Sequence, residues 1–465
     1  MSNHPKAPRE KALRINLDPM HYGTFAEIGA GQEVVRWFFQ AGGAAGTIAK
    51  SISAYDMKVS DAIYGTCARY VCRERLEAML EYEQSLNLQR LGESRNHSTF
   101  FAFADTVSAR NFHGTNECHG WMGIKFQARP GGPNSQVIIH VRMLDVENAL
   151  QQEALGIVGV NLIYGACFLR HEPEKLVDSL LDGLNTKRIE IDLIELTGEE
   201  FSYVDNRIMS LRLVQLGLSG ATMFSASGKV LQPSEVLRKR PVLVERGRFR
   251  PVTHVNLDLA ASALRAFEEE ADDVEPGETL PIMEITMRNR VNEGDVDLSD
   301  FISRAEVLAT TGHTVMISDF FEYYRLAAYL FRYTNRRIGL AMGIPNLKEI
   351  FNESYYDALD GGILESFGRL FKNNLKLYVY PFLEPVTREL ITVDKLSIDP
   401  SLRQLYGYLI ERRCIIQLTD INHSYLDIYS PDVLSRIGSH SPDWEEMVPA
   451  NVAEAIKARG LFGYA

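Results

Sequence analysis

The chain has 465 residues, of which 45% are hydrophobic and 24% are charged, and its formal net charge at pH 7 is −12. This composition excludes a fibrous or disordered chain, and the length predicts two or three domains because one hydrophobic core rarely serves so long a chain. The acidic balance excludes general nucleic-acid binding, which depends on a basic surface that displaces the counterions of phosphates.

The sequence predicts a cytoplasmic protein without a membrane partner. No apolar run has the length of a membrane span, and residues 1–17 lack the apolar core of a signal peptide. The five cysteines are scattered and do not indicate a disulfide framework; they stand at positions 67, 72, 118, 167 and 414. A reducing compartment is the simplest setting for such a chain.

The first half of the chain combines helices with an antiparallel sheet. Apolar residues recur at helical spacing in segments 30–42 and 59–92. Segments rich in β-branched and aromatic residues then predict strands, two of them joined by a Gly-Pro turn; they are residues 98–108, 120–130 and 135–145. We further expect a helix at 146–156, a buried strand at 157–168 and an alternating strand at 187–196.

The clearest internal boundary lies at residues 267–281, an acidic stretch with Pro, Gly and few apolar side chains. Such a stretch has little to bury, which favours an exposed linker. The sequence therefore predicts a first domain of residues 1–266 and a second domain of residues 282–465.

Short apolar segments alternate with amphipathic segments in the second half. This rhythm is typical of βαβ units with a mainly parallel sheet. The expected strands are residues 251–259, 280–287, 313–320, 337–343, 375–382 and 414–420. The predicted fold class is therefore an antiparallel α+β N-terminal half followed by a mainly parallel α/β C-terminal half.

A glycine-rich stretch, residues 16–51, has two interpretations. Gly29 and Gly31 form a G-x-G motif ahead of a helix, with Lys50 further on, and backbone N–H groups at a helix start can hold a phosphate. No strong strand precedes the motif, and the third glycine of a dinucleotide fingerprint is missing. The other interpretation, which we favour for the glycines themselves, is close packing with tight turns.

A basic segment, residues 238–251, carries six Lys or Arg side chains against one Glu. One interpretation is a solvated loop or an edge strand. The other is an anion site in which Arg246 and Arg248 contact a phosphate or an acidic partner.

Polar residues also stand at the ends of expected strands, where open α/β sheets bind their ligands. Glu284 and Arg288 share strand parity, which predicts either an ion pair or an anion-binding Arg. Asp319 ends another strand, where it either caps the next helix or acts in catalysis.

Residues 116–121, NECHGW, bring together a carboxylate, a thiol and an imidazole. Adjacent side chains of a strand point to opposite faces, so Cys118 and His119 do not serve each other. Glu117 and His119 share a face and are candidate catalytic residues, and His140 is expected nearby. We expect no metal, because neither C-x-x-C nor H-E-x-x-H occurs, and no motif identifies a cofactor.

Four segments stand out together: LDPMHYGTFAEIGAGQEV, FFAFADTVSARNF, QQEALGIVGVNLIYGA and PSEVLRKRPVLVERGRFRPVT. They resemble a widespread bacterial family of uncharacterised cytosolic proteins, and the resemblance covers nearly the whole chain. Members of that family carry the labels nicotinate-nucleotide adenylyltransferase or TonB-dependent receptor. The receptor label requires a signal peptide and many barrel strands. Adenylyl transfer requires an H-x-G-H turn, and here His21 and Gly23 are followed by Thr24 instead of a second His.

Two classes of function follow from these patterns. The first is a small-molecule enzyme or metabolite-binding protein that acts on a phosphorylated or nucleotide-like anion. The second is a non-catalytic scaffold that assembles as a homo-oligomer, which the incomplete motifs and the aromatic stretch 320–333 favour. We favour the first class, with a small phosphorylated metabolite as partner, and we also expect a homo-oligomer.

Overall fold

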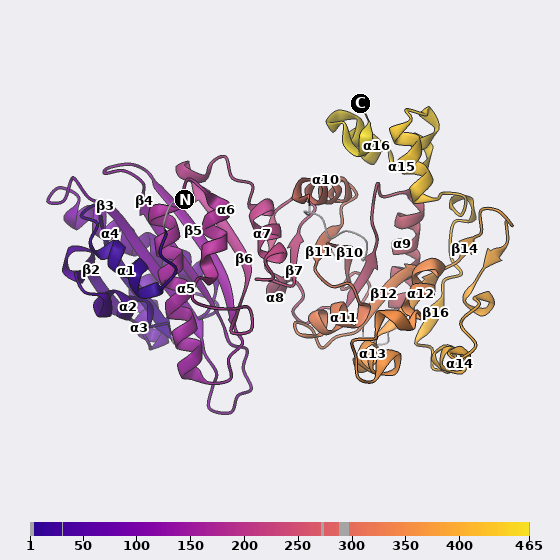
Figure 1. The fold of residues 1–465 in the computed structure, drawn as a ribbon, viewed down its shortest axis with the longest axis horizontal. Coiled ribbons are helices and arrows are strands. Elements are labelled where there is room, and N and C mark those ends of the chain that lie inside the picture. Colours follow the sequence, from indigo (N-terminus) through magenta and orange to yellow (C-terminus); the bar gives the residue numbers. More distant parts are fainter. Residues whose placement is uncertain (1–3, 30, 271–273, 288–296, 465) are drawn as a thin grey trace. The chain divides into compact units, whose positions relative to one another are not determined.

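The computed structural model describes residues 4–29, 31–270, 274–287 and 297–464. The chain forms two compact units, Met1–Ser219 and Gly220–Ala465. The predicted fold class is confirmed, because the first unit has a sheet that is largely antiparallel and the second has a mainly parallel sheet (Figure 1). Among the described helices, none combines the length and the apolar character that crossing a membrane requires.

The sheet of the first unit has the strand order β2-β1-β3-β4-β5-β6. Its strands are β1 (His21–Gly29), β2 (Ile48–Ser53), β3 (Thr99–Ser108), β4 (His119–Gln127), β5 (Asn134–Met143) and β6 (Ile189–Gly198). Strands β3 to β6 pair antiparallel, as the segments between 98 and 145 predict. Strand β1 pairs parallel to both β2 and β3, so a strand does precede the G-x-G motif.

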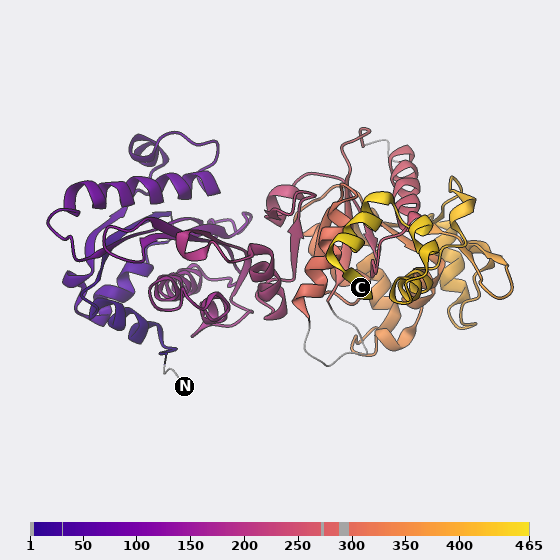
Figure 2. The same ribbon diagram turned by 90° about the horizontal axis from the view of Figure 1, so that it is seen from above.

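Helices cover both faces of this sheet (Figure 2). One face carries α4 (Arg73–Leu91), preceded by α3 (Met57–Tyr64). The other face carries helices that pack on one another and on the sheet: α1 (Pro8–Asn16), α2 (Val34–Ala41), α5 (Asn148–Phe168), α6 (Pro173–Asp178) and α7 (Asn206–Gln215). The apolar residues of β3, β4 and β5 on this second face form the core with α2 and α5.

The expected strand at 157–168 is wrong, because these residues continue helix α5. The helix is buried on nearly all sides, so its sequence is apolar without a polar stripe. A continuous apolar run of this kind does not distinguish a buried strand from a buried helix. Gly159 faces Val34 so closely that a Cβ would clash with that side chain, which explains the small residue there.

The second unit contains an eight-stranded sheet with the order β16-β13-β12-β9-β10-β11-β7-β8. Its strands are β7 (Ala221–Phe224), β8 (Val230–Leu231), β9 (Val242–Arg246), β10 (Leu280–Thr286), β11 (Thr314–Ser318), β12 (Ile338–Gly343), β13 (Lys376–Tyr380) and β16 (Ile415–Gln417). The strands from β16 to β11 pair parallel, and β7 pairs antiparallel to β11. A separate two-stranded sheet joins β14 (Phe382–Leu383) to β15 (Leu390–Ile391).

Helices also flank the second sheet. They are α8 (Pro233–Val236), α9 (His254–Glu269), α10 (Leu298–Ala309), α11 (Tyr323–Phe331), α12 (Ile344–Ile350), α13 (Gly362–Leu370), α14 (Arg403–Glu411), α15 (Ser430–Gly438) and α16 (Ala450–Arg459). The expected strand at 251–259 is wrong, because α9 begins there. Thr253 and Asn256 form a capping box at its start, a local signal that outweighs the β-branched residues.

The predicted linker at 267–281 lies inside the second unit instead of between two units. Helix α9 ends at Glu269 and strand β10 begins at Leu280, and β10 pairs with β9 from the other side of this segment. The division falls at Ser219 and Gly220. Acidic residues with Pro and Gly are typical of loops within a domain as well as of linkers between domains. The composition of this segment therefore could not locate the domain boundary.

Candidate functional site

The second unit has a topological switch point between β9 and β12. These two strands are neighbours, but the chain proceeds from β9 towards β10 and β11 and from β12 towards β13 and β16. The two connections therefore leave the carboxyl ends of neighbouring strands in opposite directions. In open α/β sheets this divergence leaves the crevice in which ligands bind.

The loop after β9 presents two arginines. Phe249 is buried with a positive φ of 46°, and its ring lies 2.7 Å from the position that a Cβ at Gly247 would occupy. This turn places the aromatic ring inside, while Arg248 and Arg250 on either side of it are exposed. A left-handed conformation at a residue other than glycine is costly and persists only where the surroundings fix it.

Two residues of helix α10 hold the loop: one binds the loop's backbone and the other binds one of the loop's two arginines. Arg304 donates to the carbonyl oxygen of Arg248 (3.2 Å) and pairs with Asp300 (2.7 Å). Arg250 pairs with the same Asp300 (2.5 Å). The side chain of Arg248 forms no ion pair with any described residue, so its guanidinium remains available to a ligand.

Helix α9 starts directly after this loop. Thr253 is its N-cap residue, and the sixteen-residue helix directs the positive end of its dipole towards the loop. His254 stacks on Tyr425, with ring centroids 5.1 Å apart and an interplanar angle of 13°. Burial lowers the pKa of His254, which keeps this stacked ring neutral.

A buried ion pair between Arg246 and Glu284 lies beside the switch point. Arg246 Nε donates to Glu284 Oε2 (2.6 Å), and its Nη1 donates to the Phe321 carbonyl (2.7 Å). Ser318 donates to Glu284 Oε1 (2.5 Å), and the Arg246 guanidinium lies 4.5 Å from the centre of the Tyr323 ring. These contacts fix the carboxyl ends of three neighbouring strands.

This arrangement changes the roles expected for four residues. Arg246 is 8% exposed and paired, so the structure does not offer its guanidinium to an anion. Glu284 has Arg246 as its partner, whereas Arg288 lies outside the described residues. Asp319 does not cap helix α11, since the N-cap residue is Glu322. The basic segment is also no edge strand, because β9 has neighbours on both sides.

Glu245, which the sequence did not single out, is buried beside the switch point on the α9 face of the sheet. Asn256 donates to its Oε1 (3.0 Å), and its Oε2 has no hydrogen-bond partner among the described residues. Burial raises the pKa of Glu245 to about 8. It borders a cavity of about 10 Å³, a space that suits one water molecule.

The glycine-rich loop of the first unit packs tightly over carboxylates. Gly29 has a φ of +79°, and a Cβ at this position would clash with the Val107 carbonyl. A Cβ at Gly31 would clash with the carboxylate of Asp105. The glycines therefore allow the β1–α2 loop to lie against strand β3.

The start of helix α2 is already occupied by an acidic side chain. Glu27 Oε1 accepts a hydrogen bond from the Val34 N–H (3.0 Å), which takes up a donor that a phosphate would need. Asp105 is fully buried beside it, and neither of its oxygens has a partner among the described residues. Lys50 pairs with the buried Glu83 instead of turning to this loop. The carboxyl groups of Glu27 and Asp105 therefore occupy the place beneath the glycines where a phosphate would bind.

A relay of three side chains lies on the α4 face of the same sheet. His119 Nδ1 is 3.0 Å from His140 Nε2, and His140 Nδ1 is 2.6 Å from Asp192 Oδ1. His140 and Asp192 are buried, whereas His119 is partly exposed. Burial and the neighbouring His140 lower the pKa of His119 to about 4, so this imidazole is neutral at pH 7 and is a weak base there.

The sequence anticipated this relay in part. The proximity of His140 to His119 is as expected, but Glu117 pairs with Arg142 (3.2 Å) instead of joining the relay. Asp192 was not anticipated; its only signal is an acidic residue within the alternating segment 187–196. The glycine-rich loop belongs to the first compact unit and Arg248 to the second.

Comparison with known proteins finds no matching family model and no matching curated protein. Solved structures that resemble part of the chain include the following three. The competence/damage-inducible protein CihA from Agrobacterium tumefaciens is 17% identical with a TM-score of 0.24, over 35% of this chain and 97% of that chain. A competence or damage-inducible protein from Enterobacter asburiae is 11% identical with a TM-score of 0.25, over 35% and 97%. A competence-damaged protein (CinA) superfamily protein from Klebsiella pneumoniae is 13% identical with a TM-score of 0.24, over 35% and 94%.

Proposed function

We propose that the second unit binds a phosphorylated or nucleotide-like small molecule at the carboxyl ends of β9 and β12. The observation that carries this proposal is the strand order, which reverses direction between these two strands. Ligands of doubly wound sheets bind at such a point, with their anionic group at the start of the helix that follows the first strand.

The charges around the switch point favour an anionic ligand. Arg248 is exposed and has no ionic partner among the described residues, and it precedes the start of helix α9. A guanidinium and the positive end of a helix dipole both favour a phosphate. At the end of β12, a Cβ added at Gly343 would meet only Pro345, at 3.5 Å, so a ligand has room to approach the backbone there.

The proposal assigns binding and no reaction. Assembly as a homo-oligomer, the alternative expected from the sequence, stays a prediction that light scattering of the purified chain tests directly.

The experiment measures ligand binding by the full chain and two variants. Isothermal titration and thermal denaturation use a panel of nucleotides, dinucleotides and sugar phosphates, together with the matching nucleosides and sugars that lack phosphate. Arg248→Ala removes one charge-assisted hydrogen bond, worth about 1.5–3 kcal/mol, and raises Kd roughly 10- to 100-fold. Arg238→Ala is the matched control, because this exposed arginine belongs to the same basic segment but precedes the amino end of β9.

Two results contradict the proposal. One is that no phosphorylated compound binds or raises the melting temperature of the wild type. The other is that Arg238→Ala weakens binding as much as Arg248→Ala does, since this outcome indicates attraction to the net charge of the segment instead of a site.

A further inference from the structure

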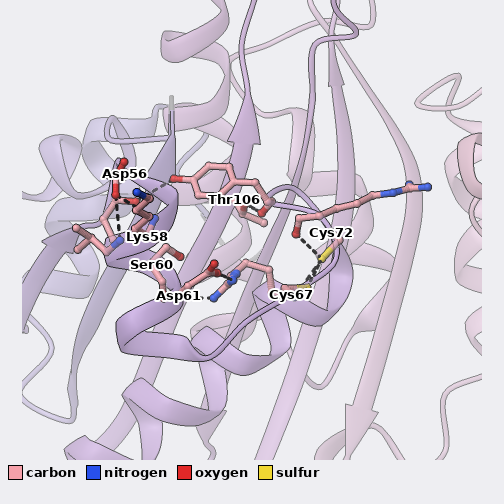
Figure 3. Close-up of polar contacts among 12 residues, drawn as sticks. Asp56, Lys58, Ser60, Asp61, Cys67, Cys72 and Thr106 are labelled. Carbon is pink, nitrogen blue, oxygen red and sulfur yellow. Dashed lines mark hydrogen bonds and ion pairs between the residues drawn. The ribbon is translucent and has the colours of Figure 1, made fainter.

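Two cysteines of the first unit lie side by side at the start of helix α4 (Figure 3). Cys72 is the N-cap residue of this helix and is 5% exposed, and Cys67 belongs to the preceding connection and is partly exposed. Their Sγ atoms are 3.1 Å apart. The other three cysteines stand in separate parts of the fold, at positions 118, 167 and 414.

The surroundings hold Cys72 and the connection before it in place. Cys72 Sγ accepts from the Arg75 N–H (3.4 Å) and donates to the Arg69 carbonyl (3.2 Å). Tyr70 lies between the two cysteines in the chain, and its hydroxyl donates to the Ala54 carbonyl (2.9 Å). Thr106 on strand β3 donates to the Tyr70 carbonyl (2.8 Å). The connection is thus anchored to the sheet, and little conformational freedom remains to be lost when the sulfurs join.

The spacing of the sulfurs distinguishes a disulfide from a metal site. Glu74 is near enough to serve as a third ligand, because its carboxylate and both sulfurs lie within 4.8 Å of one another. Two thiolates on one tetrahedral Zn²⁺, each at about 2.3 Å, stand roughly 3.8 Å apart. The observed 3.1 Å is shorter than that separation, and it lies about 1 Å from the length of an S–S bond. Glu74 is also exposed, whereas ligands of structural metals are enclosed.

We propose that Cys67 and Cys72 are a redox-active pair that forms a reversible disulfide by exchange with a low-molecular-weight disulfide. Cys67 is the attacking residue because it is partly exposed, whereas Cys72 is buried. The Cys67 thiolate attacks one sulfur of the external disulfide and forms a mixed disulfide with it. The S–S bond of the external disulfide breaks, and its other sulfur leaves as a thiolate. The Cys72 thiol then loses its proton and attacks the Cys67 sulfur of the mixed disulfide, and the second thiolate leaves. The protein loses two electrons and two protons, and the external disulfide is reduced to two thiols.

The order of attack agrees with the different environments of the two thiols. Burial and the hydrogen bond with Cys67 raise the pKa of Cys72 to about 12, so this thiol is a poor nucleophile in bulk solution. It needs only to resolve a mixed disulfide that forms in contact with it. A disulfide between two cysteines so close in the chain closes a very short loop, so it constrains the unfolded chain little.

The experiment counts the free thiols of the full chain. The reduced protein is incubated with glutathione disulfide, quenched with acid, denatured and titrated with a thiol reagent. The wild type falls from five thiols to three, and intact mass spectrometry shows the loss of two hydrogens without an adduct. Cys118→Ser, the matched control, falls from four thiols to two.

Two variants test the assigned roles. Cys67→Ser retains its four thiols, because the buried Cys72 does not start the exchange. Cys72→Ser keeps a hydroxyl at the N-cap, which preserves the helix start, and it accumulates a mixed disulfide of glutathione with Cys67. Loss of thiols from Cys67→Ser, a peptide map that links other cysteines, or no loss from the wild type overturns the proposal. Stoichiometric zinc that protects both thiols in the purified wild type also overturns it.

Discussion

Glu27 and Asp105 occupy the same register on the neighbouring parallel strands β1 and β3, and both carboxyl groups are buried. Burial and the charge of Glu27 hold the pKa of Asp105 well above its ordinary range. Burial also raises the pKa of Glu27 to about 8, against the opposing effect of the amide groups of helix α2. The folded protein therefore retains protons on this pair at pH values where the unfolded chain has released them.

Asp105→Asn is expected to reduce the dependence of stability on pH. Because both folded pKa values are raised, the wild type has its full stability below the unfolded values, near 4, and loses it as the pH rises towards 8. The loss is about 1.4 kcal/mol per pH unit for each linked proton. Asparagine does not ionise and leaves Glu27 beside a neutral group, so the variant gains stability relative to the wild type as the pH rises.

The measurement is urea denaturation of both proteins at several pH values between about 5 and 8, the range in which the linkage acts. Glu93→Gln, at an exposed carboxylate of the same unit, serves as the control. A difference between Asp105→Asn and the wild type that does not change with pH would contradict the assignment of buried protons to this pair.

Glu284→Ala is expected to destabilise the protein by about 3–5 kcal/mol, because it leaves the buried guanidinium of Arg246 without its carboxylate. The control is Asp420→Ala, which breaks the exposed pair with Arg265 and costs less than about 1 kcal/mol. Urea denaturation followed by circular dichroism compares the two variants. Equal losses would show that the Arg246–Glu284 pair is not the buried support that the contacts indicate.

Gly31→Ala is expected to lower the free energy of unfolding by about 1–3 kcal/mol, since the added methyl group meets the buried Asp105 carboxylate. Gly407→Ala in helix α14 is the comparison, because a Cβ there has open space and alanine favours a helix by about 1 kcal/mol. Thermal and urea denaturation report both changes. If Gly31→Ala is as stable as the wild type, the close approach of the β1–α2 loop to strand β3 is refuted.

His119 is expected to titrate near pH 4 in the folded protein. The unfolded histidine takes up its proton near its ordinary value of 6.5, so stability falls as the pH drops from about 6.5 towards 4. Nuclear magnetic resonance of the imidazole protons, assigned by the signal that disappears in His119→Gln, measures this pKa. A midpoint near 6.5 would mean that His119 is solvated and separate from His140.

The sequence was informative where local pattern and tertiary context agree. The antiparallel strands between 98 and 145 alternate and are joined by a turn, so both their existence and their pairing follow from nearby residues. The strands from 280 to 420 are short apolar segments spaced by amphipathic helices, which predicts a parallel sheet. Residues 157–168 of helix α5 were wrongly predicted as a strand. Their burial removes the polar face that gives a helix its characteristic sequence period.

The candidate site was less accessible to sequence reasoning, because its members meet through pairings between distant strands. Arg246 meets Glu284 across β9 and β10, whereas parity within one strand had suggested Arg288. The position of Arg248 at a switch point depends on the strand order, which no local pattern contains. Cys67 and Cys72 are close in sequence, but their contact depends on how the connection folds back on the start of helix α4.

The position of β9 in the middle of the eight-stranded sheet affects how the second unit folds during its synthesis. Val242 pairs with Leu280 of β10 on one side and with Ile338 of β12 on the other. The edge of β9 that faces β12 therefore stays unpaired until residues 338–343 have left the ribosome. Until then an apolar strand presents a row of unpaired backbone groups, which is a template for pairing with another chain. A chain that stops before residue 338 keeps that edge open permanently and is expected to aggregate.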